Sequence, residues 1–168
     1  MPLSLKKTDP SFKFQVASTP GGENITRCFA CGTCTAGCPV REIDERYNPR
    51  KIIHMALLGM KEVILKSDFV WLCSACYTCT ERCPQDVAIT DLMTALKNIA
   101  VSEGYIHPSY VEQVKALEAF DGLYEIGDFD NKKREKHNLP QIKREQGTLK
   151  KIMEETGVIS AVRRGGKE

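Results

Sequence analysis

The sequence predicts an all-α fold built around an internal duplication, followed by an extended, partly helical C-terminal tail. Apolar residues recur at helical spacing in several segments of the 168-residue chain, and no segment shows the sustained apolar–polar alternation of a strand. All eight cysteines fall into two short runs, and the second run repeats the first after a shift of 45 residues. Because the segment between the runs also follows a helical pattern, a duplicated helical unit is expected.

The first expected elements follow in chain order. Residues 1–22 contain several proline and glycine residues and predict a loose N-terminal arm that packs only in part. After the first cysteine run, Asn48 is a typical N-cap and Pro49 a typical first helical residue, so a helix is expected there. We expect residues 67–72 to form a second short element that leads into the second cysteine run.

Two further helices are expected after the second run. Thr90 or Asp91 begins the first of them, and Gly104 is a fitting terminator. Ser109 and Glu112 have the spacing of a capping box and predict the start of the next helix. The chain beyond the second cysteine run is therefore expected to be helical as well.

Three regions are expected: an N-terminal arm (1–22), a helical domain (23–122) and a C-terminal extension (123–168). The extension carries more basic than acidic residues and too little apolar surface to fold alone. A helix is expected within it from Thr148 to about Thr156. We expect the extension to lie along a partner protein, and a solvated, mobile tail is the alternative.

Each cysteine run reads C-x2-C-x2-C-x3-C and is followed by proline. Three cysteines at this spacing let one tight loop place its sulfurs around a corner of an iron–sulfur cube, whereas the fourth leaves in another direction and ligates the other cluster. The sequence therefore predicts two [4Fe–4S] clusters whose iron atoms use all eight cysteines. Cluster 1 is assigned to Cys28, Cys31, Cys34 and Cys83, and cluster 2 to Cys73, Cys76, Cys79 and Cys38.

The connection between the runs favours a helical ferredoxin. In the small β-hairpin ferredoxins, short strands and turns join the two runs. Here 34 residues (39–72) separate them and follow a helical pattern. We therefore predict an all-α ferredoxin domain that binds two [4Fe–4S] clusters, with a helical segment after each cysteine run.

Composition excludes several other classes of protein. Lys plus Arg is 24 and Asp plus Glu is 22, a near balance that argues against a nucleic-acid binder. No apolar stretch approaches the roughly 20 residues of a membrane-spanning helix, and no secretory signal is recognised at the N-terminus. A cytoplasmic location is expected, where cysteines are metal ligands more often than disulfides. Structural zinc is disfavoured because four thiolates within eleven residues do not close comfortably around one ion.

The sequence shows no motif for chemistry beyond the clusters. It contains neither a dinucleotide-binding G-x-G-x-x-G nor a nucleotide-binding G-x-x-x-x-G-K motif. The three histidines are not paired at a spacing that suggests a metal site or a general base. We therefore assign no catalytic residue and expect the chain to transfer electrons. Four threonines within the runs are candidate hydrogen-bond donors to cluster sulfur: Thr33, Thr35, Thr78 and Thr80.

The two cysteine segments resemble the C-type (HdrC) subunit of soluble heterodisulfide reductase. The resemblance rests on residues 27–39 (RCFACGTCTAGCP) and 71–84 (WLCSACYTCTERCP), and covers roughly residues 23–104. The C-G-T-C-T-x-x-C-P and C-Y-T-C-x-E-R-C-P details are more specific than cysteine spacing alone. Beyond about residue 120 the chain matches no family pattern, so nothing is carried over to the tail.

The resemblance implies an electron-transfer subunit within a larger complex. In that family a flavin-containing, HdrA-type protein splits electron pairs by bifurcation. The HdrC-type protein passes electrons to an HdrB-type protein with C-C-G motifs, which reduces a disulfide. This chain has no C-C-G motif, as expected for a separate HdrC-type chain. Hydrogenase or formate dehydrogenase modules are further candidate members of such an assembly.

Two other functions stay open on the sequence. One is the electron-transfer subunit of another flavin- or quinone-linked oxidoreductase, for which a separate protein would supply any membrane anchor. The other is a free, diffusible ferredoxin. The long tail and the near-neutral charge argue against the latter, because diffusible carriers are commonly small and strongly acidic. The proteins that the chain associates with would separate these functions.

Overall fold

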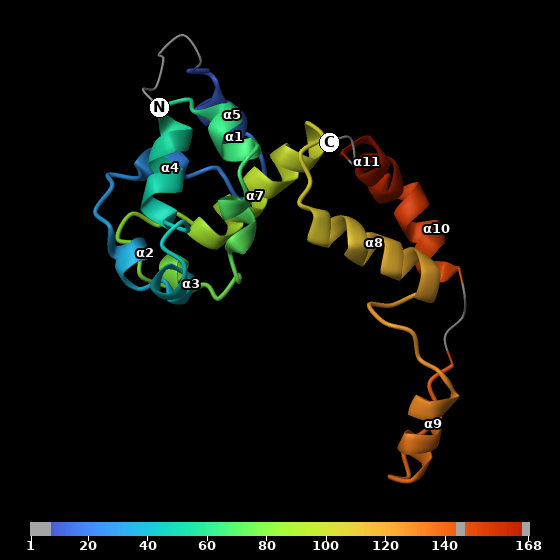
Figure 1. The fold of residues 1–168 in the computed structure, drawn as a ribbon. Coiled ribbons are helices and arrows are strands. Elements are labelled where there is room, and N and C mark those ends of the chain that lie inside the picture. The colour runs from blue at the N-terminus through green and yellow to red at the C-terminus, as the bar shows by residue number, and fades with distance from the viewer. Residues whose placement is uncertain (1–7, 144–146, 166–168) are drawn as a thin grey trace. The chain divides into compact units, whose positions relative to one another are not determined.

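The computed structural model describes residues 8–143 and 147–165, and its regular elements there are helices joined by loops and turns. No strand occurs in these ranges, so the predicted all-α class is confirmed (Figure 1). The chain divides into two compact units, one up to Tyr105 and the other from Ile106 onwards. Within the described ranges, no helix combines the length and apolar character needed to cross a membrane.

Unit 1 contains both cysteine runs. Its elements are α1 (Phe12–Ala17), η2 (Ile25–Arg27), α2 (Thr33–Ala36), α3 (Pro39–Ile43), α4 (Pro49–Leu57), α5 (Lys61–Leu65), η3 (Asp68–Leu72), α6 (Thr78–Glu81) and α7 (Ile89–Ser102). Helices α4 and α7 supply most of the core, with Ile52, Ile53, Leu92 and Leu96 almost fully buried. Burial of each such side chain stabilises the fold by roughly 1.5–3 kcal/mol.

Helix α1 corrects the expectation of a loose arm over residues 1–22. Phe12 and Val16, one helical turn apart, have no exposed surface, and α1 contacts both α4 and α7. The glycines after α1 turn the chain back tightly: a Cβ atom at Gly22 would collide with the carbonyl oxygen of Val16. Residues 12–17 are therefore part of the core, and residues 1–7 lie outside the described ranges.

Helix α4 begins as the sequence predicts. The Asn48 side chain accepts a hydrogen bond from the Lys51 N–H at 3.0 Å, and Pro49 is the first helical residue. The helix ends at Leu57, and Gly59 then adopts a φ of +75° that turns the chain towards α5. Helix α7 starts at Ile89, one residue before the predicted start, and is followed by Gly104 at φ +89°.

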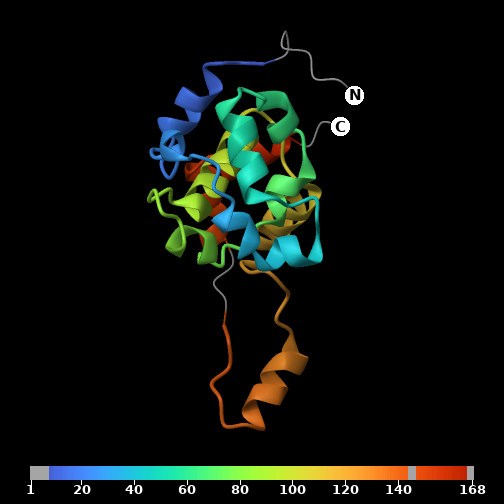
Figure 2. The same cartoon turned by 90° about the vertical axis from the view of Figure 1, so that its left-hand side faces the viewer.

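Unit 2 consists of α8 (Pro108–Phe120), α9 (Asp128–Glu135), α10 (Thr148–Glu155) and α11 (Val158–Gly165). Helices α10 and α11 contact α8 and bury Met153 and Ile159. Asp121, directly after α8, accepts a hydrogen bond from the Leu149 N–H at 2.8 Å at the start of α10. In both views α9 stands apart from the other three helices of this unit (Figure 1, Figure 2).

Two sequence expectations for unit 2 change. The N-cap of α8 is His107, whose Nδ1 accepts the Ser109 N–H at 3.3 Å, so the predicted Ser109–Glu112 capping box is wrong. The predicted helix from Thr148 is confirmed, whereas α9 and α11 were not expected.

The break between the two units falls after Tyr105, upstream of the boundary expected from the sequence. It coincides with the segment between α7 and α8, where the chain leaves the core that α7 shares with α4. The division into 1–22, 23–122 and 123–168 describes expected roles and stays a prediction, as does contact between the extension and a partner.

Candidate iron–sulfur centre

The two cysteine loops share one backbone conformation. Ala30 and Ala75 have φ values of 60° and 53°, and Gly32 and Tyr77 have φ values of 89° and 62°. Non-glycine residues rarely adopt positive φ, so its recurrence at positions related by the 45-residue shift is a property of the duplicated loop. Backbone N–H groups in such turns line concavities that bind anions, including iron–sulfur groups. The loops are thus shaped for a negatively charged cluster.

The third cysteine of each run lies in a four-residue helix. Cys34 is in α2 and Cys79 is in α6, and the two side chains are 7% and 9% exposed. Helices α2 and α6 contact each other. The Cys34 sulfur consequently lies close enough to Cys28, Cys79 and Cys31 for their charges to act on it. The duplication therefore places the two loops next to each other.

Cysteines of both runs line one cavity. Cys28, Cys31 and Cys34 of the first run face it together with Cys83 of the second run. Val87 supplies apolar lining, and its N–H donates a hydrogen bond to Cys83 Sγ at 3.4 Å. Four cysteine sulfurs around a mainly apolar space are the donor set that a [4Fe–4S] cluster requires.

Three of the other four cysteines meet around a buried tyrosine. Tyr47 is 1% exposed, and Cys73, Cys38 and Cys79 are its electrostatic neighbours. The Tyr47 hydroxyl hydrogen-bonds with Cys73. Burial is the larger cause, and this hydrogen bond the next, that raises the pKa of Tyr47 above its ordinary range. The phenol therefore remains protonated and can donate to a thiolate. The sequence analysis missed this residue, because nothing near Tyr47 in the chain indicates its contact with the second run.

Exposure and hydrogen bonding divide the thiols into two kinds. Burial raises the pKa of Cys34 to about 11 and raises that of Cys79 as well. The exposed Cys31 and Cys76 have a lowered pKa because each hydrogen-bonds with the threonine two residues further on. These threonine hydroxyls lie 3.4 Å from Cys31 Sγ and 3.5 Å from Cys76 Sγ. The thiolate, which is the form that binds iron, is thus favoured at the exposed edge of each loop.

The other two threonines join the loops to the long helices. Thr35 Oγ1 accepts the Arg50 N–H at 3.1 Å, and Thr80 Oγ1 accepts the Thr90 N–H at 3.1 Å. Arg50 and Thr90 are the second residues of α4 and α7, whose first N–H groups lack partners within the helix. The positive ends of two helix dipoles are therefore held against the cysteine loops, where they stabilise negative charge.

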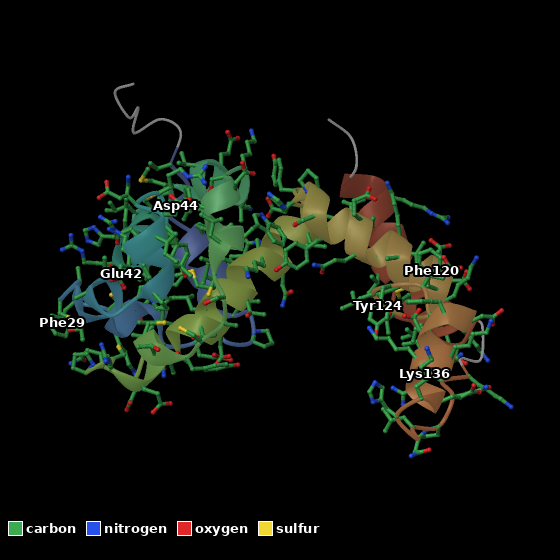
Figure 3. All side chains as sticks on the ribbon, turned by 60° about the horizontal axis from the view of Figure 1, so that its bottom comes forward. Phe29, Glu42, Asp44, Phe120, Tyr124 and Lys136 are labelled. Atoms are coloured by element: carbon green, nitrogen blue, oxygen red, sulfur yellow. The ribbon has the colours of Figure 1, made fainter. Side chains whose placement is uncertain are left out.

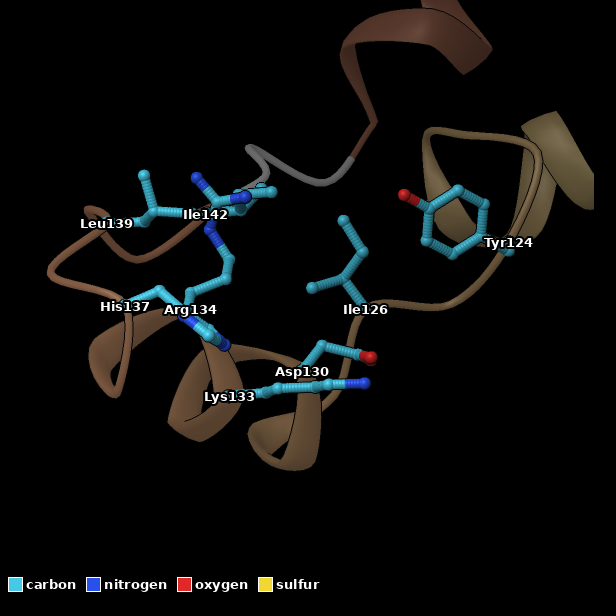
Figure 4. Close-up of a pocket in the computed structure, with 8 residues that line it drawn as sticks. All are labelled: Tyr124, Ile126, Asp130, Lys133, Arg134, His137, Leu139 and Ile142. Atoms are coloured by element: carbon cyan, nitrogen blue, oxygen red, sulfur yellow. The ribbon is translucent and has the colours of Figure 1, made fainter.

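The remaining groups in the described ranges do not form a further metal site. No three His, Cys, Asp or Glu side chains there are arranged around a single ion. His54 is exposed on α4, and His107 caps α8. A second cavity, in unit 2, contains no cysteine and is lined by Tyr124, Ile126, Asp130, Lys133, Arg134, His137, Leu139 and Ile142 (Figure 4).

Eight free cysteines in two matched loops, carried by helices, define a helical iron–sulfur protein with two cluster sites. Residues 24–87 match the family of 4Fe-4S dicluster domains. The chain therefore carries [4Fe–4S] clusters, and its eight cysteines fit two of them.

Curated relatives identify the family. The chain is 46% identical over 82 residues to a C-type iron–sulfur subunit of CoB–CoM heterodisulfide reductase from Methanocaldococcus jannaschii, covering 49% of this chain and 43% of that protein. It is 39% identical over 90 residues to the C-type subunit of the H2:CoB-CoM heterodisulfide,ferredoxin reductase of Methanothermobacter thermautotrophicus, covering 54% of this chain and 48% of that protein. It is 32% identical over 121 residues to the C-type subunit of the ferredoxin:CoB-CoM heterodisulfide reductase of Methanosarcina mazei, covering 72% of this chain and 74% of that protein.

The chain belongs to the HdrC family of heterodisulfide reductases, whose members are iron–sulfur subunits of an oxidoreductase. The predicted family and cofactors are thus confirmed. The matched region spans less than half of the length of the Methanocaldococcus and Methanothermobacter relatives.

Proposed function

We propose that this chain relays electrons from a flavin-containing, HdrA-type protein to an HdrB-type protein with C-C-G motifs that reduces a disulfide. The observation that supports this most directly is the joining of two cysteine loops by α2 and α6, which gives two cluster sites in one small unit. When bound, the clusters supply one-electron transfer. The chain's own residues bind them, shield Cys34 and Cys79 from water, and expose Cys31 and Cys76 at the surface.

The disulfide chemistry is proposed to lie on the HdrB-type partner. The names of the relatives refer to a CoB-CoM heterodisulfide, to ferredoxin and to H2. All eight cysteines of this chain are proposed as cluster ligands, which leaves none as a redox-active dithiol. A hydrogenase or formate dehydrogenase module is a further proposed member of the assembly. We place this activity in the cytoplasm, where free thiols persist.

The proposed ligand sets cross between the runs. The cavity shared by Cys83 and the first run supports cluster 1, and the position of Cys38 near Tyr47, together with cysteines of the second run, supports cluster 2. In this arrangement the fourth ligand of each cluster comes from the other run. The sets are Cys28, Cys31, Cys34 and Cys83 for cluster 1, and Cys73, Cys76, Cys79 and Cys38 for cluster 2.

Anaerobic purification of the tagged chain from its own host tests the function. We expect a flavoprotein and a C-C-G-motif protein to copurify in stoichiometric amounts, and the complex to reduce a disulfide with a flavin-linked donor. A membrane cytochrome or a hydroxy-acid dehydrogenase in their place would transfer the chain to another oxidoreductase. A monomeric, brown chain without partners would identify a diffusible ferredoxin.

Four single variants test the ligand sets. Cys83→Ala is expected to alter the same electron paramagnetic resonance signal as Cys31→Ala, and Cys38→Ala the same signal as Cys76→Ala. The exposed Cys31 and Cys76 serve as references for their own runs. If Cys83→Ala instead matched Cys76→Ala, each cluster would be held within one run and the crossed sets would be wrong.

A further inference from the structure

Helices α4 and α7 are equivalent elements of the duplication. Thr35 and Thr80 are related by the 45-residue shift, and each accepts the N–H of the second residue of the helix that follows its run. Those second residues are Arg50 in α4 and Thr90 in α7. Counting from this matched hydrogen bond aligns the two helices residue by residue.

The aligned helices differ in charge. Arg50, Lys51 and His54 are exposed on α4. The positions that match Lys51 and His54 on α7 are occupied by Asp91 and Thr94, and the position that matches Arg50 is an uncharged threonine. No salt bridge within the described ranges neutralises Arg50 or Lys51. The start of α4 therefore presents positive charge that the matched start of α7 lacks, and Lys97 of α7 stands two turns further along its helix.

This surface adjoins the first cysteine loop. Arg50 lines the cavity of Cys28, Cys31, Cys34 and Cys83. On its other side Arg50 borders a shallow pocket of the surface, which is lined by Ala30, Asn48, Arg50, Lys51, His54, Met55 and Leu58. The positive charges therefore lie beside Cys31, the exposed cysteine that is proposed as a ligand of cluster 1.

Apolar side chains accompany these charges. Leu58 is 58% exposed at the end of α4, and Phe29 is 61% exposed and lies at the outer edge of the first cysteine loop (Figure 3). Aromatic residues and arginine are enriched at protein interfaces, and long-range charge attraction steers partners to them. We refer to Phe29, Arg50, Lys51, His54 and Leu58 as the cationic edge.

We propose that the cationic edge is the docking surface for a redox protein whose own redox centre is surrounded by carboxylates, and that electrons cross it at cluster 1. This proposal rests on the proposed function in electron transfer. Complementary charge selects the occupant: the edge repels a basic partner and attracts an acidic one. The matched positions at the start of α7 lack this charge, so that site does not compete for the same partner.

The test compares charge reversal at the edge with equal charge reversal elsewhere in unit 1. The variant is Lys51→Glu, which keeps the backbone N–H that Asn48 caps and leaves Arg50, which lines the cavity of cluster 1, unchanged. The control is Lys13→Glu, which makes the same change of charge on α1, away from α2 and α3 (Figure 1). Both are purified with clusters, and their iron content is required to equal that of the unmodified chain.

The readout is the second-order rate of electron transfer between the chain and each purified partner, the HdrA-type and the HdrB-type protein. It is measured by stopped-flow at low and physiological salt. We expect the edge variant to slow transfer with one partner at least about tenfold at low salt, and to remove its salt dependence. We expect the rate with the other partner, and both rates of the control, to stay within about twofold of the unmodified chain.

Zero-length carbodiimide coupling gives an independent readout, because it joins lysine amines to carboxylates in contact. We expect Lys51 to couple to an Asp or Glu of the docked partner, and Lys13 and Lys66 to couple to no residue of that partner. Equal rates for the edge variant and the unmodified chain, or equal losses in the control, would overturn the docking proposal and leave the proposed function intact. An unmodified chain that exchanges electrons with neither partner would overturn both. Binding to phosphatidylglycerol vesicles that is lost only in the edge variant, with unchanged rates, would overturn protein docking and assign the edge to a lipid surface.

Discussion

Tyr47→Phe removes one hydroxyl group from the second cluster site and leaves the aromatic ring in place. Tyr47 is buried, and its hydroxyl hydrogen-bonds with Cys73, a proposed ligand of cluster 2. The matched residue in the second half is Val87, which lines the cavity of cluster 1 and stands three residues before Thr90 just as Tyr47 stands three residues before Arg50. Cluster 1 therefore has no equivalent hydroxyl, and its potential serves as an internal reference.

The size of the effect follows from the charge that reduction adds. A hydrogen bond to a charged group contributes about 1.5–3 kcal/mol. Reduction places another negative charge near the Cys73 sulfur, so the bond is stronger in the reduced state. If about half of that energy depends on redox state, its loss lowers the potential of cluster 2 by about 30–60 mV, since about 59 mV corresponds to a tenfold change for one electron.

Potentiometric titration followed by electron paramagnetic resonance measures both clusters of the same sample. We expect the cluster 2 signal to shift to a more negative potential and the cluster 1 signal to stay in place. Tyr105→Phe is the matched control, because Tyr105 is half-buried in the same unit and its ring lies 5.7 Å from the Lys66 amine. An intact variant with an unchanged cluster 2 potential would refute the role of the hydroxyl group.

Two further predictions follow from exposure and packing. After iron removal, the rate at which iodoacetamide alkylates each cysteine should follow its thiolate content and its access to solvent. We expect Cys31 and Cys76 to react first and Cys34 and Cys79 last, as followed by mass spectrometry. Equal rates for all four cysteines would show that the pKa shifts are wrong. Gly22→Ala should destabilise unit 1 by roughly 1–3 kcal/mol in denaturant unfolding, because its Cβ would collide with Val16, whereas Gly127→Ala, with open space, should be neutral.

The sequence predicted the elements that local signals specify. The cap at Asn48 and the glycine after α7, Gly104, are such signals, and the structure confirms them. Helix α1 was missed because its six residues are too few to be stable alone, and burial of Phe12 and Val16 against α4 and α7 fixes it. Tertiary contact, which a local pattern does not contain, decided this element.

The same distinction applies to the site. The cysteine spacing predicted the loops and the clusters, because the ligands of one loop lie close together in the sequence. The roles of Thr35 and Thr80 as caps of later helices, and of Tyr47 beside Cys73, arise between segments distant in the sequence. The repeated cysteine spacing predicts two equivalent halves, and therefore does not indicate where the two halves differ.

Those differences give the pair of clusters a direction. Two equal halves would have equal potentials and equal surfaces, and electrons would have no preferred entry. Here the Tyr47 hydroxyl would raise the potential of cluster 2 and the Arg50 charge would act in the same sense on cluster 1, whereas only cluster 1 has Arg50 and Lys51 beside it to attract a partner. Electrons that enter at cluster 1 would then leave by cluster 2. We therefore expect Lys51→Glu to slow reduction of the chain by the proposed flavin-containing partner and not its oxidation by the proposed HdrB-type partner; the opposite result would reverse the direction.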